Sequence, residues 1–390
     1  MGRQDVSNPL QLGQPFHTWT GNPLGDSTVS SITLYDNEIP KFAKATLERL
    51  YENVYCTLPR IAAYETVKGI STYVRRIGEK IVAIILFRDL GSRIAVVNQQ
   101  ISLTQSEILS FCHAVFAKYR KAQAISFYAL DTRLEDFPLP FQQTGALEEN
   151  IIYFSKTKEM YLASIRPTFL KKLNKSAELI RADHPTYKIS YFARTQIKKA
   201  HVEDVLELAK KRMISKGKQT YTDSIDIIPL MATLRSYGHL VVATIDDKIC
   251  AGSVSFKVGQ RNFHQIAAHD PTYDRYELGN QIWLAAILHS FDLNGSECWL
   301  MGGKSEQKSK FRARQHILNT IIVYRSQLHV FLNCKTSLGL WLRQKNANIK
   351  PRLQVMVDRL EGKAPSVIRF LRNTHVRKTT TSRSNPAHED

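Results

Sequence analysis

The chain has 390 residues, 43% of them apolar, and a formal net charge of +19 with a pI near 9.7. No segment approaches the roughly 18 consecutive apolar residues that cross a bilayer, which argues against a membrane-spanning protein. Because lysine and arginine are almost never buried unpaired, the excess charge must lie on the surface. It predicts a polyanionic partner: a nucleic acid, an acidic carrier protein, an anionic membrane surface or the phosphates of a cofactor.

The cysteines and the first residues of the sequence indicate the cellular compartment in which the protein is found. Residues 1–36 are polar and contain no apolar core of a signal peptide. The five cysteines are scattered along apolar patterns, at Cys56, Cys112, Cys250, Cys298 and Cys334. This spacing indicates buried thiols in a reducing compartment and neither disulfides nor metal ligands. We therefore expect a cytoplasmic protein without a bound metal.

Residues 1–29 are expected to form a flexible arm, and residues 30–157 a first domain. Apolar periodicity in this domain predicts a β-α-β-β-β-α-β-β order. The predicted elements are a strand at 31–35, a helix from Ile39 to Tyr51, a hairpin turning at 77–80, a strand at 94–97, a helix at 105–118 and strands at 124–128 and 150–154.

Residues 158–330 are expected to form a second domain, joined to the first by a basic helix at 159–182. The remaining predicted elements are strands at 188–192, 239–245, 249–258, 262–269, 297–301 and 317–324, and helices at 201–213, 226–237, 279–294 and 306–313. Residues 331–376 predict a basic helical extension. Residues 377–390 are rich in Thr and Ser and predict a disordered tail.

One hairpin pattern occurs in both domains. The first copy has strands at 84–87 and 94–97 around a turn at 90–93, and the second has strands at 253–256 and 263–267. Repetition of a whole supersecondary unit indicates a duplicated fold. The differences between the copies then indicate which of them is active.

The loop that leads into the following helix differs between the copies. The second copy has Gly279 at the start of its helix, whereas Gln99–Thr104 of the first copy contains no glycine. Free N–H groups and the positive end of a helix dipole make such a start a seat for phosphate. The first domain is therefore expected to be a degenerate scaffold or a wall of an acceptor cleft, and the second to bind the donor.

Three antiparallel strands, a glycine-opened helix and a strand parallel to the last of the three resemble the core of the GNAT acyltransferase superfamily. The resemblance rests on Asp270–Gln281, on the strand Cys298–Met301 with Gly302 and Gly303, and on Lys308–Arg312. Two such units resemble the double-GNAT arrangement of the Fem family of aminoacyl transferases and of the CelD/BcsL-like acyltransferases associated with exopolysaccharide synthesis. The resemblance implies an α+β fold of two tandem GNAT-like domains with mixed, mostly antiparallel sheets.

The resemblance also implies a donor site. Its residues would be Arg275, Leu278, Gly279, Asn280 and Gln281. The usual GNAT phosphate loop has two glycines, and this chain keeps one, so coenzyme A is not the only donor to consider. The phosphopantetheine arm of a carrier protein and an aminoacyl-tRNA are the alternatives.

Acyl transfer to an amine requires a base for the ammonium proton and an acid for the leaving group. His269, at the end of a strand beside the cleft, is the first candidate base, and His264 is a second. Asp270 would orient His269 or only cap the turn before Pro271. Tyr324, on the last strand, is the candidate acid.

Basic residues after the fifth strand of the second domain are candidates for binding an anionic donor or acceptor, although a solvated face is the ordinary interpretation of such a cluster. The candidates are Lys308, Lys310 and Arg312. The segment Gly302–Ser305 resembles part of a P-loop, but that pattern requires a glycine at the position of Cys298.

The sequence therefore predicts a GNAT-type N-acyltransferase that moves an acyl or aminoacyl group from a thioester of CoA or a carrier protein to an amine or hydroxyl. The acceptor would be a small molecule, a saccharide or a peptide, in exopolysaccharide or envelope metabolism. The alternatives are a tRNA-using or nucleic-acid-binding protein, an inactive GNAT scaffold, and a protein that contacts a membrane surface peripherally.

Overall fold

The structure is a computed structural model that describes residues 30–217, 220, 222–302 and 306–333. The expected N-terminal arm, the helical extension beyond residue 333 and the C-terminal tail lie outside these residues. The chain divides into two compact units, residues 1–329 and 330–390. All strands described below belong to the first unit.

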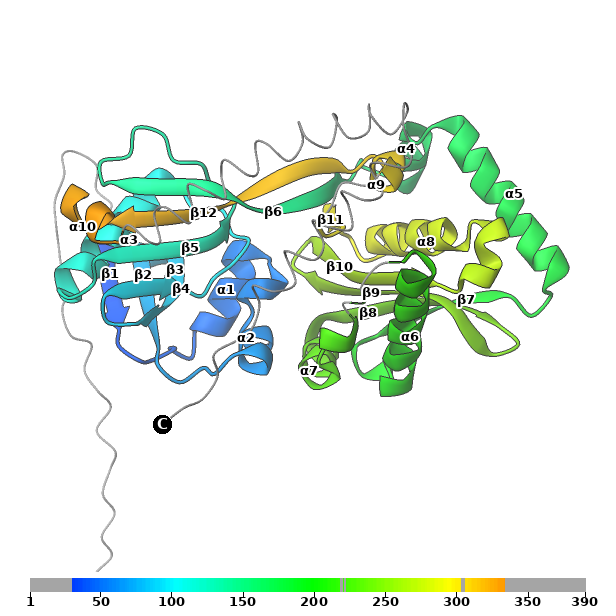
Figure 1. Cartoon of the computed structure of the whole chain (residues 1–390), viewed down its shortest axis with the longest axis horizontal. Coiled ribbons are helices and arrows are strands. Elements are labelled where there is room, and N and C mark those ends of the chain that lie inside the picture. Colours follow the sequence, from blue (N-terminus) through cyan, green and yellow to red (C-terminus); the bar gives the residue numbers. More distant parts are fainter. Residues whose placement is uncertain (1–29, 218–219, 221, 303–305, 334–390) are drawn as a thin grey trace, which may run out of the picture. The chain divides into compact units, whose positions relative to one another are not determined.

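One mixed sheet of twelve strands runs through the described part of the first unit (Figure 1). Its order is β1-β2-β3-β4-β5-β12-β6-β11-β10-β9-β8-β7. The first half of the chain supplies β1 (Ser30–Tyr35), β2 (Ile70–Ile77), β3 (Lys80–Asp89), β4 (Arg93–Val96), β5 (Ala124–Leu130) and β6 (Phe141–Tyr153). The second half supplies β7 (Lys188–Ala193), β8 (Gly238–Ile245), β9 (Lys248–Val258), β10 (Arg261–His269), β11 (Glu297–Trp299) and β12 (Arg314–Tyr324).

The last strand of each half crosses into the other half. β6 pairs with β12 over most of its length and, at residues 151–153, with β11 of the second half. β12 in turn pairs with β5 of the first half, ending at Tyr324 opposite Ala124. The two halves therefore share one continuous sheet. This exchange explains why β6 begins at Phe141, nine residues before the predicted strand at 150–154.

Among the strands that the structure describes, two pairs are parallel, β4 with β5 and β10 with β11. Each pair is short: Arg261–Phe263 of β10 pair with Glu297–Trp299 of β11, and beyond these residues the ladder ends. Where the ladder hydrogen bonds end, nothing in the sheet holds the two parallel strands side by side, and they can separate. In each half, therefore, a parallel strand pair separates where its ladder ends, and this opens a split in the sheet.

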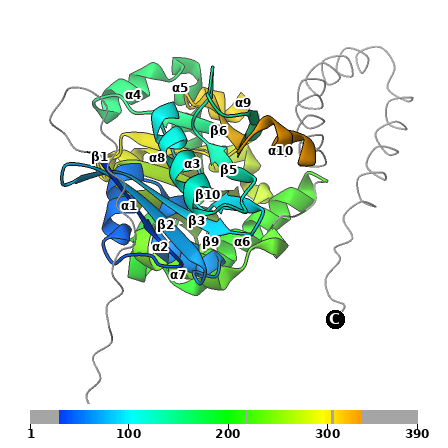
Figure 2. The ribbon, with the colours of Figure 1, turned by 90° about the vertical axis from the view of Figure 1, so that its left-hand side faces the viewer.

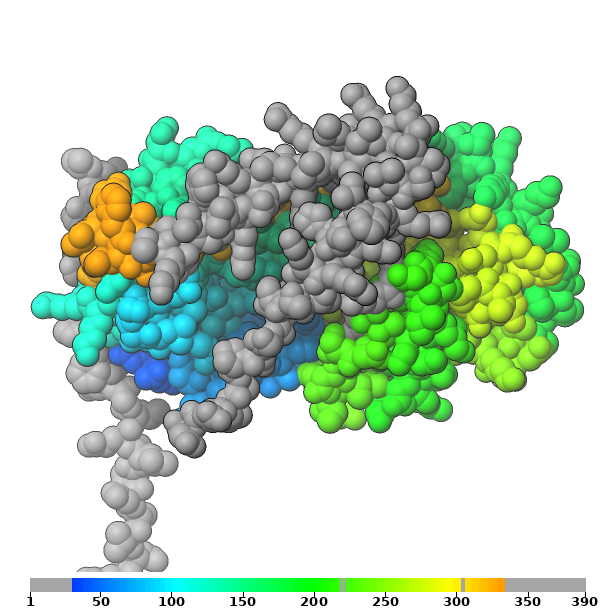
Figure 3. Space-filling model, viewed as in Figure 1, coloured from blue at the N-terminus to red at the C-terminus, as the bar shows by residue number. Residues whose placement is uncertain are grey.

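Helices cover both faces of the second half. The first half contains the helices α1 (Ala43–Tyr51), α2 (Leu58–Tyr64) and α3 (Gln105–Lys118). The second half contains α4 (Lys158–Ser164), α5 (Pro167–Asp183), α6 (Lys199–Ser215), α7 (Ile227–Tyr237), α8 (Leu278–Asp292), α9 (Glu306–Lys310) and α10 (Gln327–Leu332). Val242 of β8 packs in one core with α6 and α7, whereas its neighbour Val241 packs with α8. Successive side chains of a strand point to opposite faces, so α8 and the pair α6/α7 lie on opposite sides of the sheet. The α6/α7 layer is exposed in the space-filling view (Figure 3).

The single basic helix predicted at 159–182 is two helices, α4 and α5. The break falls at Pro167, the first residue of α5. Proline disfavours the helical conformation of the residue before it, and Arg166 has an extended ψ of 125°. The sequence contained this signal, and the prediction did not use it.

α1, α3, α6, α7, α8 and α9 agree with the predicted helices to within a few residues, whereas α2 and α10 were not predicted. Figure 2 views the molecule from the side of the first half. Cys56, Cys112, Cys250 and Cys298 are buried and free, as expected, while Cys334 lies outside the described residues. Among the described residues, no helix combines the length and apolar character needed to cross a membrane.

Candidate functional site

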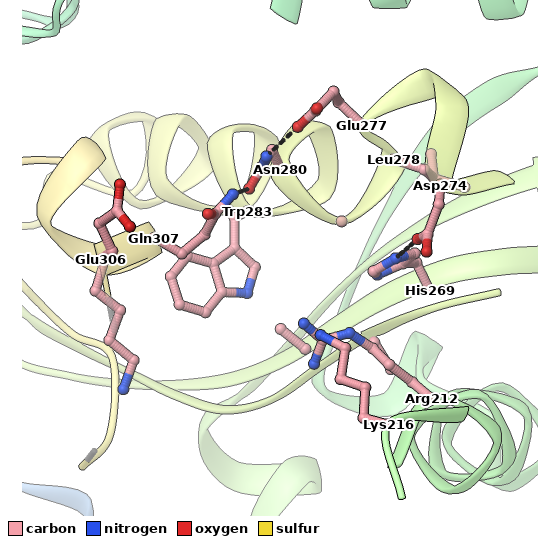
Figure 4. Close-up of a pocket in the computed structure, with 14 residues that line it drawn as sticks. Arg212, Lys216, His269, Asp274, Glu277, Leu278, Asn280, Trp283, Glu306 and Gln307 are labelled. Carbon is pink, nitrogen blue, oxygen red and sulfur yellow. Dashed lines mark hydrogen bonds and ion pairs between the residues drawn. The ribbon is translucent and has the colours of Figure 1, made fainter. Parts of the chain in front are cut away.

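A cavity of about 620 Å³ opens where β10 and β11 diverge (Figure 4). Its walls come from the end of α6, the end of β10, the start of α8 and α9, with a 3₁₀ helix, η4 (Pro271–Tyr276), between β10 and α8. The lining residues are Arg212, Lys216, Ala267, Ala268, His269, Asp274, Glu277, Leu278, Gly279, Asn280, Trp283, Glu306, Gln307 and Lys308. The cavity is lined by residues of α6 and of α8, which lie on opposite faces of the sheet, because the sheet is open where β10 and β11 separate.

His269 forms a hydrogen bond with a carboxylate in this cavity. Its Nε2 lies 2.6 Å from Oδ1 of Asp274, and only 12% of the His269 side chain is exposed. Burial lowers the pKa of His269, and the hydrogen bond to Asp274 opposes that effect. The imidazole is therefore neutral at pH 7, with Nε2 donating to Asp274 and Nδ1 left as the proton-accepting nitrogen.

The carboxylate that orients His269 is Asp274 and not Asp270. Asp270 caps η4, where its Oδ1 accepts hydrogen bonds from the backbone N–H of Thr272 at 3.0 Å and from the Thr272 hydroxyl at 2.8 Å. Of the two roles considered for Asp270, the turn cap is the one observed. The sequence offered Asp274 at five residues from His269, but only the turn of η4 brings the two side chains together.

Gly279 lies against the other nitrogen of His269. A Cβ atom at this position would lie 2.5 Å from His269 Nδ1 and 2.6 Å from its Cε1. Contacts this short require the imidazole to move. The glycine that the sequence singled out as a phosphate-binding residue is therefore also required for the packing of His269 at the start of α8.

The start of α8 carries a negative charge. Glu277, the residue before the helix, has a left-handed backbone (φ 54°, ψ 29°), and its own side chain does not cap α8. The Glu277 carboxylate contacts Lys172 of α5 and accepts a hydrogen bond from the side chain of Asn280. A carboxylate is stabilised near a helix N-terminus, and it repels a second anion there.

The corresponding helix of the first half is closed by its own side chains. Thr104 and Glu107 form a capping box at the start of α3: the Thr104 hydroxyl accepts from Glu107 N–H, and the Glu107 carboxylate accepts from Thr104 N–H at 2.7 Å. The capping box uses the Glu107 N–H of the first turn and the Thr104 N–H before it, so neither of these groups is free to bind a phosphate. This difference agrees with the expectation that the first half binds no donor.

The predicted donor-site residues do not all face the cavity. Leu278, Gly279 and Asn280 line it. Arg275 instead pairs with Asp183 at 2.9 Å, and Gln281 is buried with its amide donating to the carbonyl of Tyr276.

Lys308 is the one residue of the predicted basic set that lines the cavity. It is 7% exposed, and its Nζ donates to the carbonyl oxygens of Met301 at 2.9 Å and Gly302 at 2.7 Å. Burial lowers its pKa, and the nearby Glu149 raises it. Lys310 pairs with Glu306, and Arg312 is exposed outside the cavity.

Tyr324 is not near His269. It ends β12 inside the first half, is fully buried, and donates its hydroxyl to Gln142 Oε1 at 2.9 Å. The strand exchange moves it away from the split between β10 and β11, so the expected place beside the cleft is not observed. His264, the second candidate base, is buried with Nδ1 3.2 Å from Ser253 Oγ and does not line the cavity.

Several lining residues were not predicted from the sequence. Arg212 and Lys216 come from the last turns of α6, and Trp283 comes from the second turn of α8. The Nε of Arg212 is buried and makes no hydrogen bond within the described part of the chain. Two cationic residues one turn apart were a signal at the end of the predicted helix, but their direction depends on how α6 packs on β10.

Comparisons with known proteins identify the fold. FemX superposes with a TM-score of 0.55 at 9% identity, over 76% of this chain and 99% of FemX. The L-PGS from Bacillus licheniformis gives 0.47 at 12% identity over 80% of this chain and 97% of that chain. A tandem GNAT protein from the clavulanic acid biosynthesis pathway gives 0.37 at 9% identity over 75% and 98%. No protein-family model and no curated protein sequence matches the chain.

The likeness to FemX, together with the parallel strand pair in each half of the sheet, confirms the predicted fold class: the chain has an α+β fold of two GNAT-like halves, and these halves share one continuous sheet. At these identities the likeness concerns the fold. The chemistry has to be argued from the site itself.

Proposed function

We propose that the chain is a GNAT-type transferase that moves an acyl or aminoacyl group from an activated ester or thioester to an amine or hydroxyl acceptor. The observation that carries the proposal is the cavity at the split between β10 and β11, because it is the place in this fold where a reacting group reaches the sheet from both faces. The first half has the same split, but the start of its helix is closed by a capping box.

His269 is the proposed proton acceptor. It lines the cavity, is oriented by Asp274 and has a pKa lowered by burial, so its neutral form can accept a proton as a general base does. Lys308 is the proposed electrostatic partner of the leaving group, since a lysine at the cavity wall stabilises negative charge that develops on oxygen or sulfur.

The charges in the cavity bear on the donor. The Glu277 carboxylate at the start of α8 disfavours a pyrophosphate at that helix end. Arg212 and Lys216, on the opposite wall, offer an alternative seat for a phosphate. This arrangement supports a donor other than coenzyme A, such as the phosphopantetheine thioester of an acidic carrier protein or the ester of an aminoacyl-tRNA.

A tRNA-using protein is the second candidate, supported by the net charge of +19. Binding through lysine and arginine to phosphates falls steeply with added salt. An inactive scaffold is the third. A role in exopolysaccharide or envelope metabolism and a cytoplasmic location stay predictions from the sequence.

The test offers the full chain three donors in parallel: acetyl-CoA, an acetylated acyl carrier protein and alanyl-tRNA. Loss of the acyl group is followed with hydroxylamine as a general nucleophile. We expect turnover of at least one donor, reduced about 100-fold in His269→Ala, the usual scale for losing a general base. His113→Ala, an exposed histidine on α3, is the matched control. Absence of turnover with all three donors refutes the proposal.

A further inference from the structure

The carboxylates that line the transfer cavity are all engaged with other side chains. Three of its described lining residues are acidic, and their partners are His269 for Asp274, Lys172 for Glu277 and Lys310 for Glu306. None of these carboxylates therefore neutralises Arg212, which lines the same cavity from α6.

Arg212 is half-buried, and its guanidinium reaches into the cavity (Figure 4). Its Nε is shielded from water and makes no hydrogen bond within the described part of the chain. The cavity, of about 620 Å³, leaves room for a small molecule beside the other nitrogens of this guanidinium. A guanidinium binds a carboxylate or a phosphate through two parallel N–H donors, so this wall of the cavity suits an anion.

Arg212 lies beside the proposed base. The helix that carries it, α6, packs on β10 and on η4, the elements that end at His269 and contain Asp274. Burial lowers the pKa of His269, the hydrogen bond to Asp274 raises it, and the positive charge of Arg212 lowers it further. An anion bound at Arg212 would therefore lie within a few bonds of the atom that gives its proton to His269.

Trp283, on α8, forms the wall that faces Arg212 and Lys216. Its indole nitrogen is on the side of the ring that is turned toward these two residues (Figure 4). An indole N–H donates hydrogen bonds and accepts none, so it also suits an oxygen of an anion. The flat ring limits the space beside the guanidinium and favours a small anionic group.

The anion can enter as part of the acceptor or as a phosphate of the donor. An ammonium group that enters alone meets the positive charge of Arg212, which repels it. An acceptor that carries its own carboxylate neutralises this charge as it binds. Resting on the proposed transfer reaction, we propose that Arg212, with Lys216 and Trp283, is the carboxylate subsite of the acceptor, and that the acceptor is a free amino acid. Its α-amine then lies at His269, because the amine and the carboxylate are bonded to the same carbon.

The amino acid reacts through its α-amine. The ammonium group gives one proton to Nδ1 of His269, and the nitrogen attacks the acyl carbon of the donor. The C–N bond forms, the C–O or C–S bond to the carrier breaks, and the second proton of the nitrogen leaves with that oxygen or sulfur. His269 then returns its proton to water, and the product is an N-acyl or N-aminoacyl amino acid.

The first experiment measures binding to the full chain without a donor. NMR of protein labelled with ¹³C at Cε1 of histidine follows the His269 signal, which His269→Ala identifies by its loss. The probes are glycine, leucine and lysine, each compared with its amide, which lacks the carboxylate. We expect at least one amino acid to bind about tenfold more tightly than its amide, the scale of one charge-assisted hydrogen bond. N-acetylglycine, which carries the carboxylate alone, should raise the pKa of His269 because it neutralises Arg212.

Variants of Arg212 then assign the carboxylate. Arg212→Met should abolish both the preference for the amino acid over its amide and the effect of N-acetylglycine on His269. Arg212→Lys, which keeps the charge and loses the paired donors, should retain part of both effects, and it decides the question if Arg212→Met does not fold. The matched control is Lys211→Met, an exposed neighbour on α6 that does not line the cavity, and it should retain both effects.

Inorganic phosphate tests the other source of the anion. If phosphate binds in a manner that depends on Arg212 while the amino acids bind no better than their amides, the anion belongs to the donor and the acceptor assignment is wrong. If the preference for an amino acid survives in Arg212→Met, the subsite is wrong as well.

Failure of this inference differs from failure of the proposed function. If a donor is turned over with hydroxylamine but no amino acid is preferred over its amide, the acceptor is wrong and the transferase stands. If amino acids bind with this dependence on Arg212 and no donor is turned over, the carboxylate subsite stands and acyl transfer is refuted.

Discussion

Replacing Glu149 by glutamine should stabilise the protein at neutral and alkaline pH. The Glu149 side chain is buried, and this burial raises its pKa from the ordinary value of 4.5 to about 7. A carboxyl group with a raised pKa in the folded state favours folding less and less as it ionises. Glutamine has nearly the same shape and never ionises, so Glu149→Gln removes this penalty.

The size of the effect follows from the pKa shift. The penalty is small below pH 4.5, where the group is protonated in both the folded and the unfolded state. It grows between pH 4.5 and 7 and is complete above pH 7. At about 1.4 kcal/mol for each pKa unit, the penalty is roughly 1 kcal/mol at pH 5 and roughly 3 kcal/mol at pH 8.

Urea unfolding of the wild type and of Glu149→Gln at pH 5 and pH 8 measures this difference directly. The variant should gain about 2 kcal/mol more over the wild type at pH 8 than at pH 5. Glu148→Gln, on the exposed face of the same strand, should show no such change. A variant that is equally or less stable than the wild type at pH 8 would mean that Glu149 has a stabilising partner, and would refute this reasoning.

Three further measurements test the site and its surroundings. Gly279→Ala should displace His269 and lower the transfer rate about 100-fold, with no additional loss in the double variant with His269→Ala; additive losses would contradict the packing argument. Burial lowers the pKa of His264 to about 4, so the free energy of unfolding should fall as the pH drops from 6.5 to 4. His264→Asn should remove roughly 3 kcal/mol of that fall. An unchanged pH dependence in this variant would show that His264 is accessible to protons. Thr104→Ala should cost about 1 kcal/mol in urea unfolding and leave the transfer rate unchanged; a slower rate would mean that α3 contributes to the reaction.

The sequence predicted most strands and helices of each half, although not α2, because their apolar periods are local. The hairpins, the glycine-opened helix α8 and the parallel strand pairs that the GNAT resemblance implies are all observed. It did not predict the length of β6 or the break before Pro167. The first depends on pairing with β12, far along the chain, whereas the second was a local signal that was overlooked.

The site was predicted in part for the same reason. His269 and Gly279 lie close together in the sequence, on either side of η4, and the structure brings them into contact. Tyr324 was assigned from the position of its strand, and the exchange of strands between the halves removes it from the cavity. The burial of Glu149 had no sequence signal, since it appears only when the surrounding elements are packed.

The exchange of β6 and β12 has a consequence for synthesis on the ribosome. Ile321 and Val323 of β12 belong to the hydrophobic core of the first half, and Tyr324 bonds to Gln142, 182 residues earlier. During synthesis, the edge of β5 in the first half therefore stays unpaired until nearly the whole second half has left the ribosome. Exposed strand edges of this kind recruit other strands, so premature termination of translation before residue 314 should leave a fragment prone to aggregation.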